Sequence, residues 1–292
     1  MSCEVPNHPL QVMGGQFLLG VRRFIRVRIV MTPSLLQILP VTPIKLATWH
    51  PIGVLKHQKV TRYVQNPEAS RAFYQSVLSL SQSTLDRQDA SAVTDDHTTL
   101  EFKKSWAGPP EKTPLSPQSN HWAFTTVDPK GIVATLKERG VPFIKTQVPN
   151  TSLCQYFFQD PDGYHIELLA GPTIGPTNHR PTQLHHLSRT TNQLEQDSLF
   201  LTEVVGLKKM DNRPDFDVDG AWLTDGTLEY HLVKPDHPHR DGLGDTWTFA
   251  IKDPKKAALA LRSSGLVPYE ERHSVITSDA GGQNHYEFTN HI

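Results

Sequence analysis

The chain of 292 residues has very little cysteine and no long apolar run, and both absences narrow the class of protein. Two cysteines, Cys3 and Cys154, are too few for a disulfide framework or a zinc cluster, and they favour a reducing compartment. No apolar run approaches the roughly 18 residues that suggest a membrane-spanning helix. A mean hydropathy of −0.42 and 37% hydrophobic residues are typical of a globular protein in water.

The chain also lacks an excess of charge of either sign. Its formal net charge of −1 gives no general attraction to nucleic acid or to an anionic membrane. Neither a phosphate-binding glycine loop nor a nucleic-acid-binding motif occurs in the sequence. We therefore expect a monomer or homodimer that binds a small-molecule substrate, with no nucleic-acid or membrane partner. The expected location is the cytoplasm.

Acidic residues are absent between Glu4 and Glu68, and this sets the N-terminal segment apart. Four arginines in the segment lie among apolar residues: Arg22, Arg23, Arg26 and Arg28. Arg-rich, acid-poor N-termini are typical of organelle transit peptides, although this one is poor in serine. We predict that residues 1–50 are a leader, either disordered or a transit segment to the mitochondrion or plastid, outside the folded domains.

What the chain does contain is an internal repeat. A shift of 125 residues places Asp128-Pro129-Lys130 on Asp253-Pro254-Lys255. Four similar units follow one another, starting near residues 56, 121, 185 and 246, each with a strand, a helix and short alternating stretches. Because such a unit cannot bury its sheet face alone, we predict an α+β fold in which four βαβββ units pair into two curved-sheet domains. The predicted domains are 51–172 and 184–292, joined by a linker at 173–183.

Helix starts and stops are marked in each unit. Asn66, Asp128 and Asp253 each stand before a proline and are predicted N-caps, because Pro suits the first helical position. In the third unit, Asn192 followed by Glu195 predicts a capping box. The second unit closes on a strand, a tight Asp160-Pro161-Asp162-Gly163 turn and a second strand that contains Glu167.

These motifs resemble the vicinal oxygen chelate superfamily, which includes glyoxalase I, bleomycin-resistance proteins and extradiol dioxygenases. The resemblance covers roughly residues 57–290 and is carried by NPEASRAFYQSVLSL (66–80), HWAFTTVDPKGIVATLKERGVPF (121–143), YFFQDPDGYHIELLAGP (156–172) and HHLSRTTNQLEQDSLFLTEVVGL (185–207). It is nearest to glyoxalase I in the first half, through TLEFKKSW (99–106) and QDPDGYHIEL (159–168).

The resemblance implies a divalent metal ion, Zn, Ni, Fe or Mn, held by residues on the first and last strands of two paired units. By the repeat register, the positions are Lys59 and Glu101 in unit one, His121 and Glu167 in unit two, His186 and Glu229 in unit three, and Thr246 and Glu287 in unit four. His231 shares a strand face with Glu229 and competes with it as a ligand. Lys59 is a poor ligand, because a lysine ammonium has no lone pair.

The pairing of the units decides whether a complete site exists. If neighbouring units pair, as in the extradiol dioxygenases, each site lacks one histidine. If the units pair crosswise, as in single-chain glyoxalase I, units one and four hold a dead site and units two and three hold a complete one. We favour the crosswise site of His121, Glu167, His186 and Glu229 or His231. His185 is expected to point away from it, because neighbouring strand residues alternate.

Three functions follow from the resemblance. The first is a metal-dependent lyase or isomerase of glyoxalase I type, acting through an enediolate, with Glu167 as the catalytic base. The second is an extradiol-type ring-cleaving dioxygenase, and the third is a non-catalytic module that binds small molecules. The glutathione-binding residues of glyoxalase I have no clear match, and the nearest cationic residues are Lys103, Lys104, Arg62 and Arg189.

Overall fold

The computed structural model describes residues 51–83, 90–95, 97–105, 112–170, 182–235, 245–278 and 284–290. The predicted leader at 1–50 lies outside the described residues, as does most of the predicted linker. The first strand of the third unit begins at Thr182, just before that linker was expected to end. No helix in the described part of the chain has the length and apolar character needed to cross a membrane.

Each of the first two units has the predicted order of one strand, one helix and three further strands. Unit one contains β1 (Val54–Val64), α1 (Pro67–Leu78), β2 (Ser81–Gln82), β3 (Ala90–Thr94) and β4 (Thr99–Lys104). Unit two contains β5 (His121–Thr126), α2 (Pro129–Glu138), β6 (Phe143–Gln147), β7 (Cys154–Gln159) and β8 (His165–Ala170).

The last two units repeat this order. Unit three contains β9 (Thr182–Thr190), α3 (Leu194–Leu199) continued by the π-helix η1 (Phe200–Val205), β10 (Lys208–Lys209), β11 (Gly220–Thr224) and β12 (Glu229–Val233). Unit four contains β13 (Thr246–Ile251), α4 (Pro254–Ser263), β14 (Tyr269–Glu270), β15 (Ser274–Ser278) and β16 (His285–Thr289).

Three of the four predicted helix caps form. The side chains of Asn66, Asp128 and Asp253 accept hydrogen bonds from backbone N–H groups in the first turns of α1, α2 and α4. These bonds satisfy donors that a helix start leaves unpaired. The capping box predicted at Asn192 is wrong, since α3 begins after Gln193 and has no side-chain cap. The hydroxyl of Thr191 instead accepts the N–H of Gln193 at 2.9 Å.

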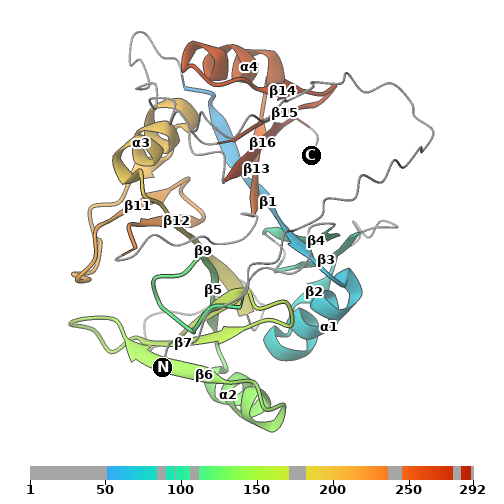
Figure 1. Cartoon of the computed structure of the whole chain (residues 1–292), viewed down its shortest axis with the longest axis vertical. Coiled ribbons are helices and arrows are strands. Elements are labelled where there is room, and N and C mark those ends of the chain that lie inside the picture. Colours follow the sequence, from blue (N-terminus) through green and yellow to red (C-terminus); the bar gives the residue numbers. More distant parts are fainter. Residues whose placement is uncertain are drawn as a thin grey trace, which may run out of the picture. The chain divides into compact units, whose positions relative to one another are not determined.

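The sheets confirm the crosswise pairing of units. One eight-stranded sheet, here sheet A, has the order β14-β15-β16-β13-β1-β4-β3-β2 and joins units one and four. The other, sheet B, has the order β10-β11-β12-β9-β5-β8-β7-β6 and joins units two and three. In Figure 1 the blue strand β1 accordingly lies beside the red β13, and the yellow β9 beside the green β5. The predicted α+β class and the two paired curved sheets are therefore confirmed.

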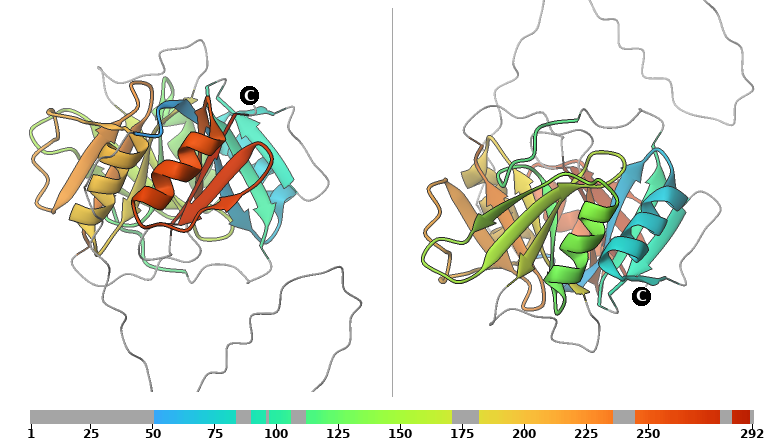
Figure 2. Two further views of the ribbon diagram at one scale, coloured as in Figure 1. Left: turned by 90° about the horizontal axis from the view of Figure 1, so that it is seen from above. Right: turned by 90° about the horizontal axis from the view of Figure 1, so that it is seen from below.

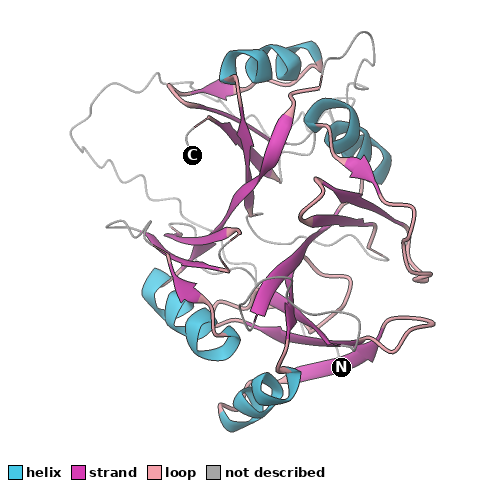
Figure 3. Cartoon of the chain, turned by 180° about the vertical axis from the view of Figure 1, so that it is seen from behind, coloured by secondary structure: helices cyan, strands magenta, loops and turns pink. Residues whose placement is uncertain are grey.

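The helices lie outside the strands, and buried side chains from the helices and from both sheets form the main hydrophobic core. The four helices surround the strands in Figure 3, and α4 crosses the strands of its own unit in the left view of Figure 2. One hydrophobic cluster joins both sheets and includes Trp122 of β5 and Trp247 of β13. The stretch 51–172 contributes half of each sheet, and 184–292 contributes the other half. The boundaries proposed for two sequential domains stay a prediction.

Candidate metal centre

The centre of sheet B is an antiparallel pair, β5 and β9, that brings two predicted ligands together. Ala123 lies opposite His186 and His121 lies opposite Ser188, so all four side chains share one face. On the other side of β5, Ala123 also pairs with Glu167 of β8. Because cross-strand partners and residues two apart share a face, His121, Glu167 and His186 are directed to one point.

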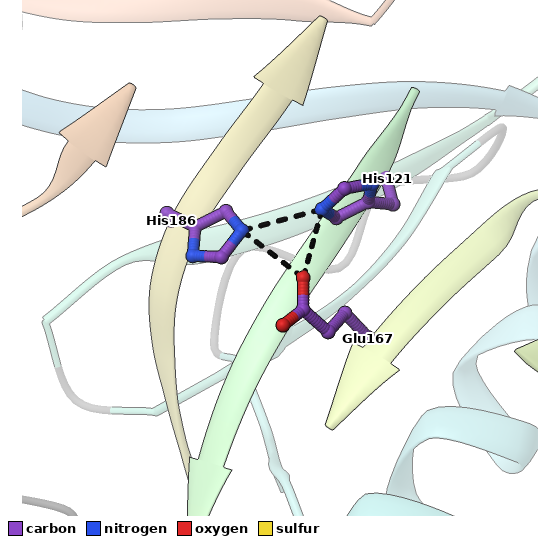
Figure 4. A group of neighbouring side chains, drawn as sticks. All are labelled: His121, Glu167 and His186. Atoms are coloured by element: carbon purple, nitrogen blue, oxygen red, sulfur yellow. Dashed lines mark hydrogen bonds and ion pairs between the residues drawn. The ribbon is translucent and has the colours of Figure 1, made fainter. Parts of the chain in front are cut away.

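The three side chains meet in contact distance, as Figure 4 shows. His121 Nε2 lies 3.0 Å from Glu167 Oε2 and 3.2 Å from His186 Nε2. His186 Nε2 lies 3.3 Å from the same carboxylate oxygen. All three side chains are buried, with Glu167 only 1% exposed. The cluster is a group of ligand atoms suited to a metal ion.

The hydrogen bonds of His121 leave a lone pair aimed at this point. Its Nδ1 lies 2.7 Å from the backbone carbonyl oxygen of Ser119. A carbonyl can only accept, so Nδ1 carries the proton and Nε2 presents a lone pair in the neutral imidazole. A carbonyl partner on the far nitrogen is the usual support of a metal-binding histidine.

The His186 ring is hydrogen-bonded to a second histidine, His185. Its Nδ1 lies 3.0 Å from Nδ1 of His185, so one ring donates to the other. Burial, together with the neighbouring His231, lowers the pKa of His186 to about 4. The ring is therefore neutral at pH 7 and, when its Nδ1 donates to His185, it presents a lone pair on Nε2 as well.

Glu167 is held as an anion by its neighbours. Burial alone would raise the pKa of Glu167, but the contacts with His186 and His121 outweigh burial and hold that pKa well below its usual range. Its other oxygen, Oε1, accepts a hydrogen bond from Gln155 Nε2 at 2.8 Å. Gln155 thus fixes the carboxylate and leaves Oε2 facing the two imidazoles.

The donor set fits a divalent ion in chemistry and in spacing. Two imidazole lone pairs and one carboxylate oxygen that converge in a buried place repel one another unless a cation or a proton lies between them. An ion about 2.0–2.1 Å from each donor separates neighbouring donors by about 2.9 Å in octahedral and about 3.4 Å in tetrahedral geometry. The separations of 3.0, 3.2 and 3.3 Å lie in this interval.

Glu229 and His231 line the same cavity and lie outside the cluster of His121, Glu167 and His186, although Glu229 forms a second group of possible ligands with His185 and His186. His231 Nε2 lies 3.0 Å from Glu229 Oε2, and the His231 ring stacks on His186 at a centroid distance of 3.8 Å. Burial lowers the pKa of His231 well below its usual value, so the ring is neutral at pH 7. Glu229 is 27% exposed and turns its other oxygen toward His185 Nε2, 3.9 Å away.

The strand register distinguishes Glu229 from His231. In sheet A, Thr61 lies opposite Glu101, and in sheet B the corresponding Ser188 lies opposite His231. His231, and not Glu229, therefore occupies the backbone position that matches Glu101.

His185 faces the cavity, and the expectation that it points away is wrong. Phe124 pairs with Leu184 and Ala123 with His186, so His185 is an extra residue in a β-bulge. The bulge interrupts the alternation of side chains, and both His185 and His186 line the cavity. The corresponding position in sheet A, Gln58, lies at the same kind of register shift in β1.

The other predicted site residues gather in sheet A. Lys59 Nζ lies 3.0 Å from Glu101 Oε2 and 4.0 Å from Glu287 Oε2. Thr246 of β13 takes the place that His121 has in sheet B. Among the described residues of sheet A there is no group of three metal ligands. The structure thus separates the eight positions into the two sets that crosswise pairing predicts.

Both arginines considered as anion binders, Arg62 and Arg189, have another role. Arg62 is 1% exposed and donates to the carboxylate of Asp245 at 3.1 and 3.0 Å, while its guanidinium lies 3.7 Å above the ring of Trp122. Arg189 lies 3.6 Å above Trp247 and donates to the backbone oxygen of Asp245. Both therefore join the sheets inside the core and are not available to a ligand.

Several residues around the site were not predicted from the sequence. Gln155, Ser119 and His185 support the three ligands. The position of Gln155 could have been predicted from the alternation of side chains along β7. Gln155 shares a face with Phe157, and Phe157 lies opposite Glu167. Ser119 acts through its backbone and a bulge has no sequence signature, so neither of the other two could be read from residue type.

The three candidate ligands line a cavity of about 240 Å³ in sheet B. Besides the histidines and glutamates, apolar side chains form most of its wall, among them Val148, Leu153, Leu169, Phe216 and Trp222. A substrate in this cavity would contact the face on which His121, Glu167 and His186 meet.

Comparisons with known proteins agree with this architecture. Residues 56–168 match the family model of the Glyoxalase/Bleomycin resistance protein/Dioxygenase superfamily. Glyoxalase I from Zea mays superposes with a TM-score of 0.59 at 15% identity, over 80% of this chain and 92% of that chain. A "putative dioxygenase" from Bacillus subtilis gives 0.57 at 15% identity, over 81% and 85%. No curated protein matches the sequence.

The motifs, the crosswise sheets and these comparisons confirm the resemblance stated from the sequence. Residues 56–168 belong to the Glyoxalase/Bleomycin resistance protein/Dioxygenase superfamily, and the described chain has the two-sheet fold of glyoxalase I.

Proposed function

We propose that this chain is a metal-dependent lyase or isomerase of glyoxalase I type, with its single active site in sheet B. The observation that carries the proposal is the convergence of His121, Glu167 and His186, whose ligand atoms lie within 3.3 Å of one another. These three residues would hold the ion. A divalent ion held there supplies stabilisation of the negative charge that develops on two neighbouring substrate oxygens.

The two glutamates of the cavity then have different tasks. Glu167, the residue that the sequence nominated as base, contacts both imidazoles and Gln155, which suits a ligand and leaves no free oxygen for a proton. Glu229 is more exposed and is oriented by the N–H of His231, so we assign it the role of proton acceptor. It takes a proton from one substrate carbon and returns it to the neighbouring carbon, without net oxidation.

A second function has one specific observation in its favour. Two histidines and one carboxylate with open positions are the donor set of many non-haem Fe(II) oxygenases. An extradiol-type dioxygenase would therefore use the same three ligands. The crosswise pairing of units, which the resemblance associates with glyoxalase I, favours the isomerase.

Metal content per chain of protein purified without a histidine tag is the first test, beside a His121→Ala variant. The proposal expects about one ion per chain in the parent, from a site of the usual three or four protein ligands, and almost none in the variant. No bound metal after exposure to Ni, Zn, Mn and Fe(II) would contradict it and leave a non-catalytic binding module.

Turnover assays distinguish the proposed isomerase from a dioxygenase. Isomerisation of α-hydroxycarbonyl compounds in the absence of oxygen supports the proposed function. Oxygen consumption with catechols, in the Fe(II) form alone, supports the dioxygenase. A Glu229→Gln protein that retains metal but loses isomerisation supports Glu229 as base, whereas loss of the metal in Glu229→Gln contradicts that role.

A further inference from the structure

The cavity wall differs from that expected of an enzyme that binds glutathione adducts. Glutathione carries two carboxylates, which need cationic or strong hydrogen-bonding partners when they are taken out of water. No lysine or arginine lines the cavity in the part of the chain that the structure describes. The charged groups that do line it, Glu167 and Glu229, are acidic and would repel a carboxylate.

The cationic residues near the cavity are directed elsewhere. Arg213 places its guanidinium 4.5 Å from the Trp222 ring and donates to the backbone carbonyls of Phe216 and Val218. Lys208 and Lys209 are exposed on β10 and do not line the cavity. Lys59, which pairs with Glu101 and Glu287, belongs to sheet A and not to the sheet that holds the cavity.

One wall of the cavity is flat and aromatic. The rings of Phe216 and Trp222 stack at 6.0 Å with an interplanar angle of 20°, and Trp222 lies 4.7 Å from the ring of His231. Gly220 makes this position possible, because a Cβ there would lie 2.4 Å from the Trp222 ring. The wall is thus fixed in place beside the proposed base and ligands.

The size of the cavity also favours a small ligand over a glutathione adduct. Its volume of about 240 Å³ is below the roughly 300–1,000 Å³ of pockets that hold drug-sized ligands. Val148, Leu153 and Leu169 extend its apolar lining, and Phe216 packs against the same cluster. Burial of apolar ligand surface is therefore the main source of affinity besides the ion.

We infer, building on the function proposed above, that the substrate is a small neutral molecule with a flat apolar body and two adjacent oxygens, and that it carries no glutathione. Its body lies against Trp222 and Phe216, and its oxygens face His121, Glu167 and His186. The thiol conjugate that glyoxalase I takes is disfavoured, because no lysine or arginine among the described residues lines the cavity to pair with its carboxylates.

A matched pair of ligands tests the charge preference. Catechol and 3,4-dihydroxybenzoate share the ring and the adjacent oxygens and differ by one carboxylate. Isothermal titration of each, and of S-hexylglutathione, into zinc-loaded protein without oxygen measures binding and not turnover. We expect catechol to bind about tenfold more tightly than its carboxylate analogue, the cost of one unpaired charge in a half-buried site, and S-hexylglutathione not to bind.

Equal or tighter binding of the carboxylate analogue would overturn the inference, as would binding of S-hexylglutathione or no binding of catechol at millimolar concentration. Met210→Lys is the matched variant, because Met210 lines the cavity and is half-buried. The added ammonium should raise the affinity for 3,4-dihydroxybenzoate severalfold and leave catechol unchanged. A Trp222→Ala variant should weaken both aromatic ligands equally.

Metal content measured on the same samples separates this inference from the proposed function. A protein that holds zinc and prefers the carboxylate analogue contradicts the inference alone. A protein that holds no metal contradicts the proposed function, and the titrations are then made on the metal-free chain, where the wall alone must still favour the neutral ligand. A preference for the anion there overturns the inference independently.

Discussion

The two sheets present the same set of backbone positions, yet one surrounds a lysine and the other gathers two histidines and a glutamate. The strand ladders place Lys59 where sheet B has His186, and Glu287 where it has Glu167. In sheet A the ammonium of Lys59 lies 3.0 Å from Glu101 and 4.0 Å from Glu287. A built-in cation therefore occupies the middle of the site.

Converging carboxylates need a positive charge, and this fold can supply it in two ways. In sheet A the ammonium supplies it, and Lys59, then Lys103, offset the effect of burial and lower the pKa of Glu101. Hydroxyls complete the arrangement, since Thr61 donates to Glu101 at 2.8 Å and Thr248 donates to Glu287 at 3.1 Å. Among the described residues no lysine pairs with Glu167 of sheet B, and we propose that an ion supplies the charge.

The largest difference between the sheets should appear when the same glutamate position is changed in each. Glu167→Gln removes the carboxylate from the proposed ligand set, and we expect metal content to fall from about one ion per chain to near zero. The matched change in sheet A, Glu287→Gln, should leave metal content unchanged, because Lys59 excludes a second cation. Metal analysis of both purified variants is the measurement.

Equal loss of metal in the two variants would show that the ion is not confined to sheet B. Folding is checked independently by the far-UV circular dichroism of both proteins, so that loss of structure is not read as loss of a ligand.

The crosswise pairing and the meeting of the two first-strand histidines could be predicted, for a physical reason. Only pairing of units two and three brings His121 and His186 together, and the sheet order agrees. The position on β12 could not be read, because the similarity of Thr-Leu-Glu at 227–229 to that at 99–101 favoured Glu229, while the ladder matches Glu101 with His231. Sequence similarity follows residue type, whereas the ladder follows hydrogen bonds.

Two further differences between the sequence-based expectations and the structure come from tertiary contacts. The bulge at His185 appears only in the pairing of β9 with β5, and residue type does not mark it. Arg62 and Arg189 are charged, and charge alone favours exposure, but stacking on Trp122 and Trp247 and bonds to Asp245 stabilise both in the core. Neither contact is local in sequence.

The two sheets also differ in the residue that supports the central glutamate. Gln155 donates to Glu167, whereas the corresponding residue in sheet A, Ser274, donates to Glu271 instead. Partners that orient a ligand typically contribute 10–100-fold to metal affinity, so we expect Gln155→Leu to weaken metal binding by about that factor. Competition with a chelator of known affinity measures the change.

Ser274→Ala is the matched control for Gln155→Leu and should leave the affinity for metal unaltered. An affinity that Gln155→Leu does not change would mean that the two imidazoles alone position Glu167.

The lysine of sheet A should stabilise the fold, because it neutralises two acidic side chains. Lys59→Met keeps most of the volume and removes the charge, and it leaves Glu101, which is 4% exposed, without its nearest cation. We expect the free energy of unfolding to fall by about 2 kcal/mol at pH 7, since a half-buried ion pair loses one partner. Urea unfolding monitored by circular dichroism gives this value.

Lys103→Met provides the matched comparison, because its ammonium lies 3.5 Å from the same oxygen of Glu101 but is 41% exposed. Screening by solvent should reduce its effect to well under that of Lys59→Met. Equal effects of the two changes would contradict the central place given to Lys59.

The smallest expected effect concerns a histidine that breaks the match between the sheets. His57 of β1 corresponds to Leu184 of β9, and the two backbone N–H groups donate alike, to Asp225 at 2.7 Å and to Asp95 at 2.8 Å. The His57 ring is buried, and neither of its nitrogens has a hydrogen-bond partner among the described residues. His57→Leu should raise the free energy of unfolding by about 1 kcal/mol at pH 7, because an unsatisfied buried polar group is removed.

The same substitution has a pH signature with a defined sign. Burial lowers the pKa of His57 to about 4 from an ordinary value of 6.5, so between these values the unfolded chain binds a proton that the folded chain does not. This histidine therefore lowers stability as the pH falls from 6.5 to 4. The melting temperature of His57→Leu should decline less over that interval than the parent's, and Leu184→His should decline more. Parallel curves for all three proteins would mean that water or rearrangement accommodates the charged ring, and that the two sheets treat the position alike.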